Sequence, residues 1–360
     1  MELQLDIQTE EKFSLLGMQA VSHDDGIILK RGSTRVMLNG THVPMILNLL
    51  LEADSQAGFS VHKIKADLPS EHWELLDDVV AALLERRLVV MLEADSKPVR
   101  TESPEDIFYW EFKTSAEQVR ARISRVSIAV FGINNLSLQL LGALKACGFG
   151  AAYLVDHPAL RGLDVADNTA PDAVSFEDWT EQDLYEESGF FVVCSDFGGL
   201  ETMREWNDFC VTENKNFMPV VIQDNISYIG PIIVPGQTPC FECLWERQNS
   251  NLADPHTERA TDNLAFFGQH ANGTLAPIIG AAANLAASEL LKFFSQVLPG
   301  ESVGKLIELH QLEPAIHKRK FVKSPFCRVC STTRFHSSSA TDKNVFMPGN
   351  DTEEHVHASS

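Results

Sequence analysis

The stretch between Val126 and Asp156 constrains the fold of this chain more than any other. Val126 to Gly132 (VSIAVFG) is an apolar run typical of a buried strand, Ser137 to Cys147 has the pattern of a helix, and Ala151 to Asp156 (AAYLVD) is a second strand. A strand, a tight turn, a helix and a strand within about 30 residues form a βαβ unit, which starts a parallel sheet covered by helices. We therefore expect an α/β domain.

Later segments extend this sheet. Strands are predicted at Phe190–Cys194 (FFVVC) and Met218–Gln223 (MPVVIQ), with a helix at Leu200–Asn214 between them. A long helix is predicted at Ile278–Gln296, because a proline stands just before it, where the missing N–H has no partner to lose. We assign residues 124–331 to this sheet domain.

A different order of elements precedes the sheet domain. Two short strands are followed by three helices and one more strand, at Gly26–Lys30, Thr34–Leu38, Val43–Leu51, His62–Leu68, Trp73–Arg86 and Leu88–Leu92. This is the element order of a winged helix, so we expect residues 1–95 to form a small winged-helix-like α+β domain. The polar, proline-punctuated segment that follows indicates a linker and connecting helix over residues 96–123. Residues 332–360, rich in Ser, Asp, Thr and His, are expected to be a disordered tail.

The charge balance excludes several classes of partner. The chain has 29 Lys and Arg against 50 Asp and Glu, a formal net charge of −21, so a nucleic-acid backbone is not expected as a ligand in spite of the winged-helix order. The acidic N-terminus (MELQLDIQTEEKF) is not a signal peptide, and the most apolar long stretch, Leu275–Leu298, is interrupted by polar and charged residues. We expect a cytoplasmic protein that does not enter a membrane.

Four of the seven cysteines form two Cys-x-x-Cys pairs, which predict a metal site. The pairs are Cys240 with Cys243 and Cys327 with Cys330. Two such knuckles complete a tetrahedral four-thiolate zinc site, which leaves no position for water, so the zinc would be structural. About 80 residues separate the pairs, far more than in a compact zinc ribbon. Two independent or redox-active pairs, or a coincidence of spacing, therefore remain as alternatives.

The turn after the first strand of the βαβ unit departs from a nucleotide-binding turn. Such a turn needs glycines, because backbone N–H groups must approach the phosphates without a β-carbon in the way. Only Gly132 is present, and Asn134 and Asn135 stand where further glycines are expected. Asp156, at the end of the second strand, is placed either to accept from a ribose hydroxyl or to serve a structural role. We expect ATP binding to be lost on this chain.

Several segments together resemble the ThiF and MoeB type of adenylating enzymes, which are related to ubiquitin activators. These are VFGINNLSLQLLGALKACGFGAAYLVD, FFVVCSDF, GPIIVPGQTPCFECL, PIIGAAANLAASELLKF and CRVC, which span about residues 124–331. The resemblance implies a ThiF-like Rossmann-type sheet domain with a four-cysteine zinc, in a family that adenylates a C-terminal carboxylate with ATP. Asp196 matches the family's acid at the magnesium and phosphate site.

The departures from the family pattern imply a vestigial nucleotide site without catalytic residues. Besides the missing glycines, Pro158 replaces the family's second acid, and no cysteine lies between Leu252 and Pro277, where a thiolester-forming cysteine often sits. The residues of this vestigial site are Gly132, Asn134, Asn135, Asp156 and Asp196.

The N-terminal region resembles the winged-helix element that recognises leader peptides of ribosomally made natural products. The whole chain is therefore similar to the ThiF-like partner proteins of azoline-forming cyclodehydratases, including the SagC-like and Ocin-ThiF-like groups. That resemblance implies a leader-peptide-binding scaffold in bacteriocin-type peptide biosynthesis. A separate YcaO-type protein would use ATP to cyclise Cys, Ser or Thr of the precursor. Dimerisation through the sheet domain is a further expectation from the family.

Leader binding has a physical basis in the N-terminal strands. An exposed strand edge within residues 20–40 can add an extended peptide as a further strand, and the helix at Trp73–Arg86 can offer a groove for its side chains. The candidate contacts are Ile28, Leu29, Val36 and Leu38 on the strands and Leu76, Val80 and Leu83 on the helix. Core packing is the alternative role for each of them.

Two other functions compete with the scaffold. One is a working enzyme that adenylates a peptide carboxylate, and the other is a winged-helix regulator that binds nucleic acid, which the acidic composition disfavours.

Overall fold

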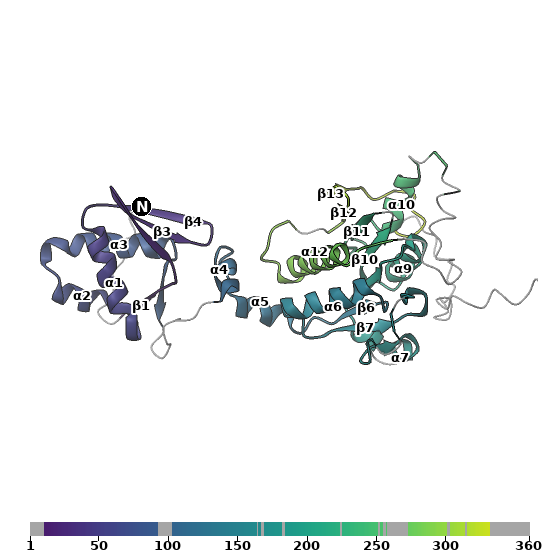
Figure 1. Cartoon of the computed structure of the whole chain (residues 1–360), viewed down its shortest axis with the longest axis horizontal. Helices are drawn as coiled ribbons and strands as arrows, with labels where there is room; N and C mark the ends of the chain where they lie inside the picture. Colours follow the sequence, from purple (N-terminus) through teal and green to yellow (C-terminus); the bar gives the residue numbers. More distant parts are fainter. Residues whose placement is uncertain are drawn as a thin grey trace, which may run out of the picture. The chain divides into compact units, whose positions relative to one another are not determined.

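The protein is described from a computed structural model (Figure 1). The structure describes residues 11–92 and 103–331, apart from 164, 167–168, 182–183, 224, 251–252, 255–256, 258–272, 301–302 and 314, and it omits the side chains of 55–57. The predicted tail, 332–360, lies outside the described residues. The chain divides into two compact units, Met1–Glu117 and Gln118–Ser360.

The first unit combines two small antiparallel sheets with helices. Its strands are β1 (Lys12–Leu15), β2 (Gln19–His23), β3 (Gly26–Arg31), β4 (Thr34–Asn39) and β5 (Val89–Leu92). Its helices are α1 (Val43–Ala57), α2 (Val61–Asp67), η1 (Ser70–His72), α3 (Trp73–Glu85) and α4 (Pro104–Trp110). β1 pairs with β5, while β2, β3 and β4 form a three-stranded sheet in that order. This arrangement agrees with the predicted small N-terminal α+β region.

The core of the first unit follows from sequence periodicity. Every second residue of β3 and β4 turns inward, and both α1 and α3 bury a stripe at helical spacing, with Ile46, Leu47 and Leu50 on α1. Trp110, at the end of α4, packs against this core, and its indole Nε1 donates to the carbonyl oxygen of Arg87 at 3.0 Å. α4 is thereby attached to the first unit.

The second unit is built on an eight-stranded sheet in the order β13-β12-β11-β10-β9-β6-β7-β8. The strands are β6 (Ile128–Phe131), β7 (Ala152–Asp156), β8 (Val174–Ser175), β9 (Phe190–Ser195), β10 (Asn216–Gln223), β11 (Ile226–Ile229), β12 (Lys305–His310) and β13 (Ala315–Lys320). β6 to β10 run parallel, and β11 to β13 extend the sheet antiparallel.

Helices cover both faces of this sheet. They are α5 (Ala116–Ile123), which begins at the boundary of the units, α6 (Asn135–Cys147), η2 (Pro158–Leu160), α7 (Phe176–Glu181), α8 (Leu184–Glu187), α9 (Leu200–Thr212), α10 (Phe241–Asn249) and α12 (Ala276–Ser295). Within β9, Phe191 belongs to an aromatic cluster with Trp179 of α7 and Trp206 of α9. Its neighbour Phe190 packs on Phe293 of α12, on the opposite face. The predicted α/β fold with a mostly parallel, Rossmann-type sheet is confirmed.

α12 is apolar because it is a core helix of this layer. Among the described residues it is the one helix long and apolar enough to cross a membrane by length and composition. It packs along α6 and against β10 and β11. Alanines such as Ala283 and Ala286 are buried there, so the apolar composition is explained by contacts within the protein.

Candidate functional site

The four cysteines of the two Cys-x-x-Cys pairs lie together in the second unit. Their Sγ atoms are all within 4.8 Å of one another. The Sγ of Cys240 is 3.9 Å from that of Cys243 and 3.6 Å from that of Cys327, and the Sγ atoms of Cys243 and Cys330 are 3.5 Å apart. A tetrahedral ion with metal–sulfur bonds of about 2.3 Å separates its ligands by about 3.8 Å. The cluster therefore has the dimensions of a four-thiolate metal site.

Each pair sits on a turn that brings its two thiols to the same point. Cys240 directly precedes α10, and the N–H of Cys243 donates to the carbonyl oxygen of Cys240 at 3.1 Å. In the second pair the N–H of Cys327 donates to the carbonyl oxygen of Ser324 at 3.2 Å. The N–H of Ser324 donates to the Sγ of Cys243 at 3.4 Å. The second turn is thus hydrogen-bonded to a thiol of the first.

Glu242 joins the two turns through charge. Its side chain is 4% exposed, and its two carboxylate oxygens accept from Nε and Nη2 of Arg204 on α9 at 2.8 and 2.9 Å. Oε1 also accepts from Nε of Arg328 at 2.8 Å. Burial alone would raise the pKa of Glu242, but the bonds from Arg204 and then Arg328 outweigh burial and lower it. The one signal in the sequence is that each Cys-x-x-Cys encloses a charged residue of opposite sign.

The thiols compete for protons in this buried space. Hydrogen bonds with Cys240 first and also with Cys330 lower the pKa of Cys327 to about 6, against an opposing effect of Cys243. Hydrogen bonding to Cys243 raises the pKa of Cys240. A divalent ion removes this conflict because it binds thiolates and releases their protons. The four thiols therefore fit a metal ion, and an all-sulfur tetrahedral set suits zinc.

The turn after β6 is filled by its own side chains. Gly132 has a φ of +109°, and a β-carbon there would lie 2.8–3.0 Å from Asn134 Nδ2 and from the carbonyl oxygens of Cys194 and Leu160. Asn134 is fully buried, and its Nδ2 donates to these two carbonyl oxygens, of Leu160 at 3.0 Å and of Cys194 at 2.8 Å. Asn134 thus occupies the space beside Gly132 that a phosphate-binding turn leaves open.

The N–H groups at the start of α6 are hydrogen-bonded within the protein. Asn134 is the N-cap of α6, and its Oδ1 accepts from the N–H of Ser137 at 3.0 Å. Asp196 follows β9 directly, is 7% exposed, and its Oδ2 accepts from the N–H of Leu136 at 3.3 Å. A helix N-terminus attracts anions through these donors. Here a carboxylate of the chain itself is the anion.

The segment after β7 covers the same turn. Asp156 ends β7 and forms an ion pair with Arg161, which follows η2. The N–H of Gly162 donates to the carbonyl oxygen of Ile133 at 2.8 Å, so the segment passes directly over the turn. Arg161 is a neighbour of the predicted site that the sequence did not indicate.

The structure brings the five residues of the predicted vestigial site together, with Asn135 half-buried as the first residue of α6. They lie at the carboxyl ends of β6, β7 and β9, where ligands bind in open α/β sheets.

Most of the predicted peptide contacts are core residues. Leu29, Leu38, Leu76, Val80 and Leu83 are buried, and Val36 packs against the same core. The five buried side chains have no free surface to offer a peptide, and Val36 is only partly exposed. The physical reason is alternation, because Leu29, Val36 and Leu38 point inward and the three helix residues share the inward stripe of α3. For these residues burial favours the core-packing alternative.

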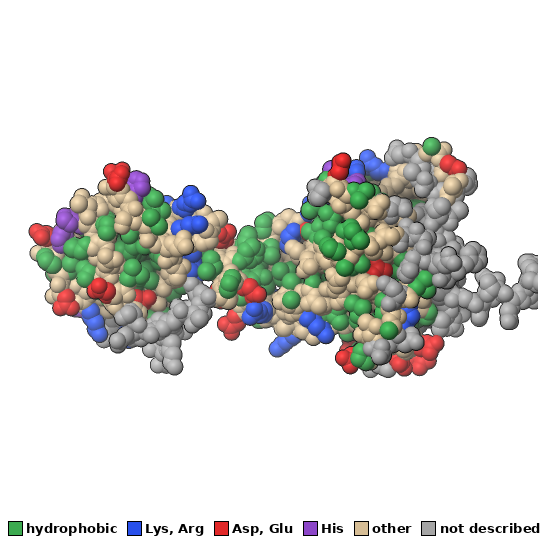
Figure 2. All heavy atoms as spheres, in the orientation of Figure 1, with side chains coloured by type: hydrophobic (Ala, Val, Ile, Leu, Met, Phe, Trp, Pro, Cys, Tyr) green, Lys and Arg blue, Asp and Glu red, His purple; other side chains and the backbone are tan. Residues whose placement is uncertain are grey.

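Ile28 alone of the seven faces outward, and it forms an apolar row with two residues that we did not predict. In the sheet register Val21 of β2 lies opposite Ile28, and Ile28 lies opposite Met37 of β4. Val21 is 54% exposed and Met37 is 38% exposed. Hydrophobic side chains reach the surface of the first unit between charged ones (Figure 2). Strict alternation from Leu29 and Leu38 could have identified this outer row.

Comparison with family profiles finds a match within the second unit. Residues 163–329 match the ThiF family. The second unit carries a ThiF-family domain. The matched residues include Asp196 and three cysteines of the cluster, Cys240, Cys243 and Cys327, and the match ends one residue before Cys330. β6, the turn at Gly132 and β7 precede the match. A search of curated protein sequences finds no match.

Solved structures with a similar fold include heterocyclases and MccB. A heterocyclase in complex with substrate and cofactor has a TM-score of 0.59 at 15% identity, and the heterocyclase TruD has a TM-score of 0.59 at 16% identity. Each comparison covers 89% of this chain but only 39% and 43% of the heterocyclase chains. E. coli MccB, solved with AMPCPP and MccA, has a TM-score of 0.56 at 18% identity over 89% of this chain and 99% of its own. At these identities the likeness concerns the fold.

Proposed function

We propose that this chain is a leader-peptide-binding scaffold of an azoline cyclodehydratase. It binds the leader of a ribosomally made precursor and presents the core to a separate YcaO-type protein, which uses ATP to heterocyclise Cys, Ser or Thr. In this proposal the chain contributes no catalytic residue of its own. The observation that carries this proposal is the closed nucleotide turn, in which Asn134 and Asp196 occupy the N-terminal donors of α6.

The closed turn argues against ATP chemistry on this chain for an electrostatic reason. Phosphate binding at a helix N-terminus depends on free N–H groups and on a positive local potential. Asp196 contributes a negative charge at that point, and Asn134 fills the volume beside Gly132. A triphosphate would have to displace both side chains and would leave the carbonyl oxygens of Leu160 and Cys194 without their donor.

The first unit supplies a surface suited to an extended peptide. Within the described residues, β2 and β4 are the two edges of the three-stranded sheet. An added strand forms main-chain hydrogen bonds at such an edge, and its alternate side chains then determine which peptide binds. A peptide added beside β2 or β4 would continue the row of Val21, Ile28 and Met37.

The similar structures support a role in peptide modification with a partner protein. The two heterocyclases named above are longer than this chain, which spans about two fifths of each. In our proposal a separate YcaO-type protein supplies the cyclodehydratase activity. The proposal also includes a cytoplasmic location, where thiols stay reduced and both ATP and precursor are available. A homodimer formed through the sheet domain is part of the same proposal.

The metal has a structural role in this proposal. Zinc, held by Cys240, Cys243, Cys327 and Cys330, would supply cross-linking of the two turns and no chemistry on substrate, since all four positions are taken by thiolates. The side chains around it, led by Glu242, fix the turns relative to α9.

The test of peptide binding uses the full chain and a fluorescently labelled cognate leader. Met37→Glu, which puts a charge into the outer row, should weaken binding at least about tenfold, because an unpaired carboxylate is costly to desolvate. Met91→Glu is the matched control, because Met91 is 63% exposed on β5, outside the three-stranded sheet, and should leave the affinity unchanged. Val21→Glu probes the other edge strand, and the larger of the two losses identifies the edge that the leader uses. The absence of saturable binding by the unmodified chain would contradict the proposal.

The competing function is an adenylating enzyme that acts on a peptide carboxylate, and one observation favours it. MccB, of similar fold, is solved with AMPCPP, and Asp196 stands at the helix end in this chain. Pyrophosphate exchange by the isolated chain with ATP and the precursor distinguishes the two functions. Exchange that is abolished in Asp196→Ala would establish the enzyme, whereas we expect none.

A further inference from the structure

The outer face of the three-stranded sheet carries a cationic row beside the apolar row of Val21, Ile28 and Met37. Lys30 of β3 lies directly opposite Arg35 of β4, two positions along the strands from the pair of Ile28 and Met37. Residues two apart on a strand point to the same face. Both basic side chains are exposed, so their charges stand on the outer face. Basic side chains lie on the first unit in Figure 2 where Figure 1 labels β4.

The cationic row is not neutralised within the described part of the chain, where neither Lys30 nor Arg35 has a hydrogen bond or an ion pair. The carboxylate of Glu111 reaches the turn between β3 and β4, but it accepts from the N–H of Ser33 at 2.6 Å, and this bond lowers the pKa of Glu111. Like charges directly opposite each other on neighbouring strands repel. The row would therefore be stabilised by an anion beside it.

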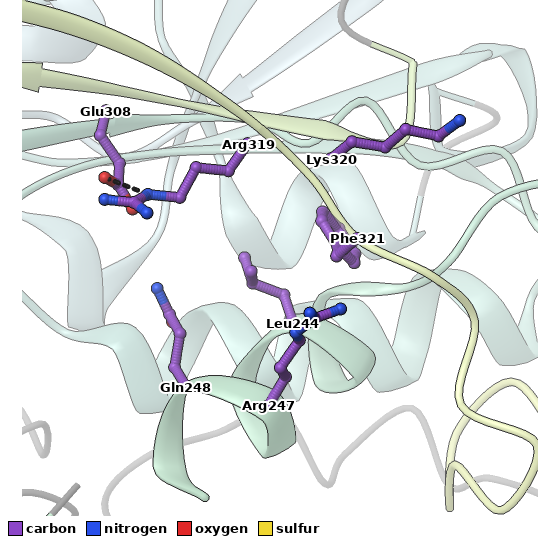
Figure 3. A pocket seen from close by; sticks show the side chains of 7 residues that line it. All are labelled: Leu244, Arg247, Gln248, Glu308, Arg319, Lys320 and Phe321. Atoms are coloured by element: carbon purple, nitrogen blue, oxygen red, sulfur yellow. Dashed lines mark hydrogen bonds and ion pairs between the residues drawn. The ribbon is translucent and has the colours of Figure 1, made fainter. Parts of the chain in front are cut away.

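Cationic side chains in a pocket of the second unit differ in this respect. The pocket has a volume of about 470 Å³ and lies between α10 and β13 (Figure 3). Arg319 Nε donates there to Oε2 of Glu308 at 2.6 Å, and Arg247 has an interaction partner of its own within the protein. The charges of the pocket need no partner from outside, whereas those of Lys30 and Arg35 have none within the described residues.

Protection of the sheet edge is the simpler explanation for a basic residue on this sheet. Edge strands commonly carry Lys and Arg because charge opposes unwanted strand pairing. That explanation applies to Arg35 on β4, but it does not account for Lys30, which lies on the central strand β3. It also does not account for Val21 and Met37, because an edge protected against pairing would not expose apolar side chains next to the charges.

The position of the cationic row distinguishes the two edges of the sheet. On the β2 side Gln19 lies opposite Lys30, so a strand added there would meet an amide in this row. A strand added to β4 would place one side chain directly opposite Arg35, with the two Cβ atoms about 5 Å apart. The next side chain on the same face would lie opposite Met37. An acidic and an apolar side chain, two positions apart, would match these two residues of β4.

On the basis of the leader-binding function proposed above, we propose that the β4 edge selects leaders in which an apolar residue is followed two positions later by Asp or Glu. The leader adds antiparallel to β4, which is the direction of both strand pairs in this sheet. Its apolar side chain continues the apolar row, and its carboxylate lies beside Arg35 and Lys30. The apolar residue comes first because the added strand runs against β4, in which Arg35 precedes Met37.

The test selects peptides on the full chain and determines their sequences. The probe is a phage-displayed library of random nine-residue peptides, enriched at low ionic strength, where exposed charges are screened least. Enriched peptides should carry Leu, Ile, Val or Met followed two positions later by Asp or Glu. One enriched peptide is then labelled with fluorescein, and its affinity is measured by fluorescence anisotropy.

Charge changes in the cationic row should alter the affinity for that peptide. Arg35→Gln and Lys30→Gln should each weaken binding about threefold, as expected for an exposed ion pair, and Arg35→Glu about tenfold. The matched controls are Arg86→Gln at the end of α3 and Lys63→Gln on α2, which remove exposed charges elsewhere in the first unit. The controls should leave the affinity unchanged.

A charge swap separates direct pairing from damage to the fold. Replacement of the acidic residue of the peptide by Lys should weaken binding to the unmodified chain about tenfold. Arg35→Glu should bind this Lys peptide more tightly than the unmodified chain does. A misfolded variant cannot gain affinity in this way.

Three results would overturn the proposal. Enriched peptides that have the apolar residue but no acid two positions later would show that the cationic row does not select, while leaving leader binding at the sheet edge intact. Equal losses in the row variants and in the controls would indicate general charge attraction. Tighter binding of the peptide after removal of residues 1–10 would assign the row to the chain's own acidic N-terminus. The titration with the cognate leader tests the proposed function separately.

Discussion

The cysteine cluster and the turn after β6 lie in the same unit but differ in whether their polar groups already have partners within the chain. At the cysteine cluster four sulfur atoms converge, at distances of 3.5 to 3.9 Å for three of their pairs, and the four thiols fit a metal ion. At the turn after β6, the side chain of Asn134 and the N–H groups of Leu136 and Ser137 are hydrogen-bonded to the chain itself. The comparison shows that position in the fold alone does not distinguish a ligand site. What distinguishes the two sites is whether their polar groups already have partners within the chain.

The largest expected effect comes from breaking the cluster. Cys240→Ser removes one thiolate, and because metal binding by such clusters is worth on the order of 10 kcal/mol and is coupled to folding, we expect loss of bound zinc together with most of the folded protein. Metal content by mass spectrometry and thermal melting measure both.

Cys147→Ser is the matched control for the cluster, because Cys147 lies at the end of α6 and should leave zinc content and melting unchanged. Full stability of Cys240→Ser without metal would show that the cluster is not a structural site.

The next effect concerns the charge that joins the two cysteine turns. Glu242→Gln leaves Arg204 and Arg328 without their buried carboxylate, which should cost about 3 to 5 kcal/mol of unfolding free energy, the usual result of breaking a buried pair. Glu201→Gln is the control, because Glu201 also pairs with Arg204 but is more exposed and should cost less than about 1 kcal/mol. Denaturant unfolding compares them, and equal costs would mean that Glu242 is not the central partner.

The segment that covers the turn after β6 should make the stability of the protein depend on pH. His157 begins the segment that crosses the turn, and burial lowers its pKa from 6.5 to about 4, a shift that the charge of Asp156 opposes. Between pH 6.5 and 4 the unfolded chain therefore binds more protons than the folded one. Stability from this residue is present above pH 6.5 and is lost as the pH falls, by about 3 kcal/mol at about 1.4 kcal/mol per unit.

His157→Phe should remove that part of the pH dependence, because Phe fits the aromatic surroundings of Phe176 and Trp206 and does not titrate. Unfolding measured at several pH values gives the slope. An unchanged slope in the variant would assign the acid sensitivity to other groups.

The smallest expected effect comes from reopening the turn. Asn134→Gly removes the side-chain cap of α6 and the bonds to Leu160 and Cys194, at a cost of about 2 kcal/mol. ATP binding should not appear, because the carboxylate of Asp196 still lies at the helix end. Asn135→Gly serves as the control, and calorimetric titration with ATP measures binding. Saturable ATP binding by Asn134→Gly would show that this one side chain closes the site.

The elements that sequence patterns located well are those buried on two sides. β6, β7, β9 and β10 read as apolar runs because helices cover both faces of the sheet, and the helix at α6 follows from its spacing and from Gly148 at its end. The antiparallel strands β11 to β13 were not predicted, since β11 is only four residues long and half-exposed, and the charged sequences of β12 and β13 lack such a run. The pocket at β13 was missed with them.

Single residues were harder to assign than elements. The cysteines were found because thiols at a spacing of two residues have few other uses. Leu76, Val80 and Leu83 were proposed as peptide contacts, but an apolar stripe on a helix fits a groove and a core equally well, and here it forms the core.

The sequence by itself determined the α/β class, the order of the elements and the ligand type of the metal site, because hydrophobic periodicity and cysteine chemistry are local properties. Only the tertiary structure decided that Asp196 lies at the start of α6, that Asn134 bridges η2 and the end of β9, and that Arg247 and Arg319 share one pocket. The physical reason is that these arrangements join segments far apart in the sequence, such as Asn134 with Cys194 and Leu136 with Asp196, each pair 60 residues apart. Strand order and packing of the whole sheet fix where such segments meet.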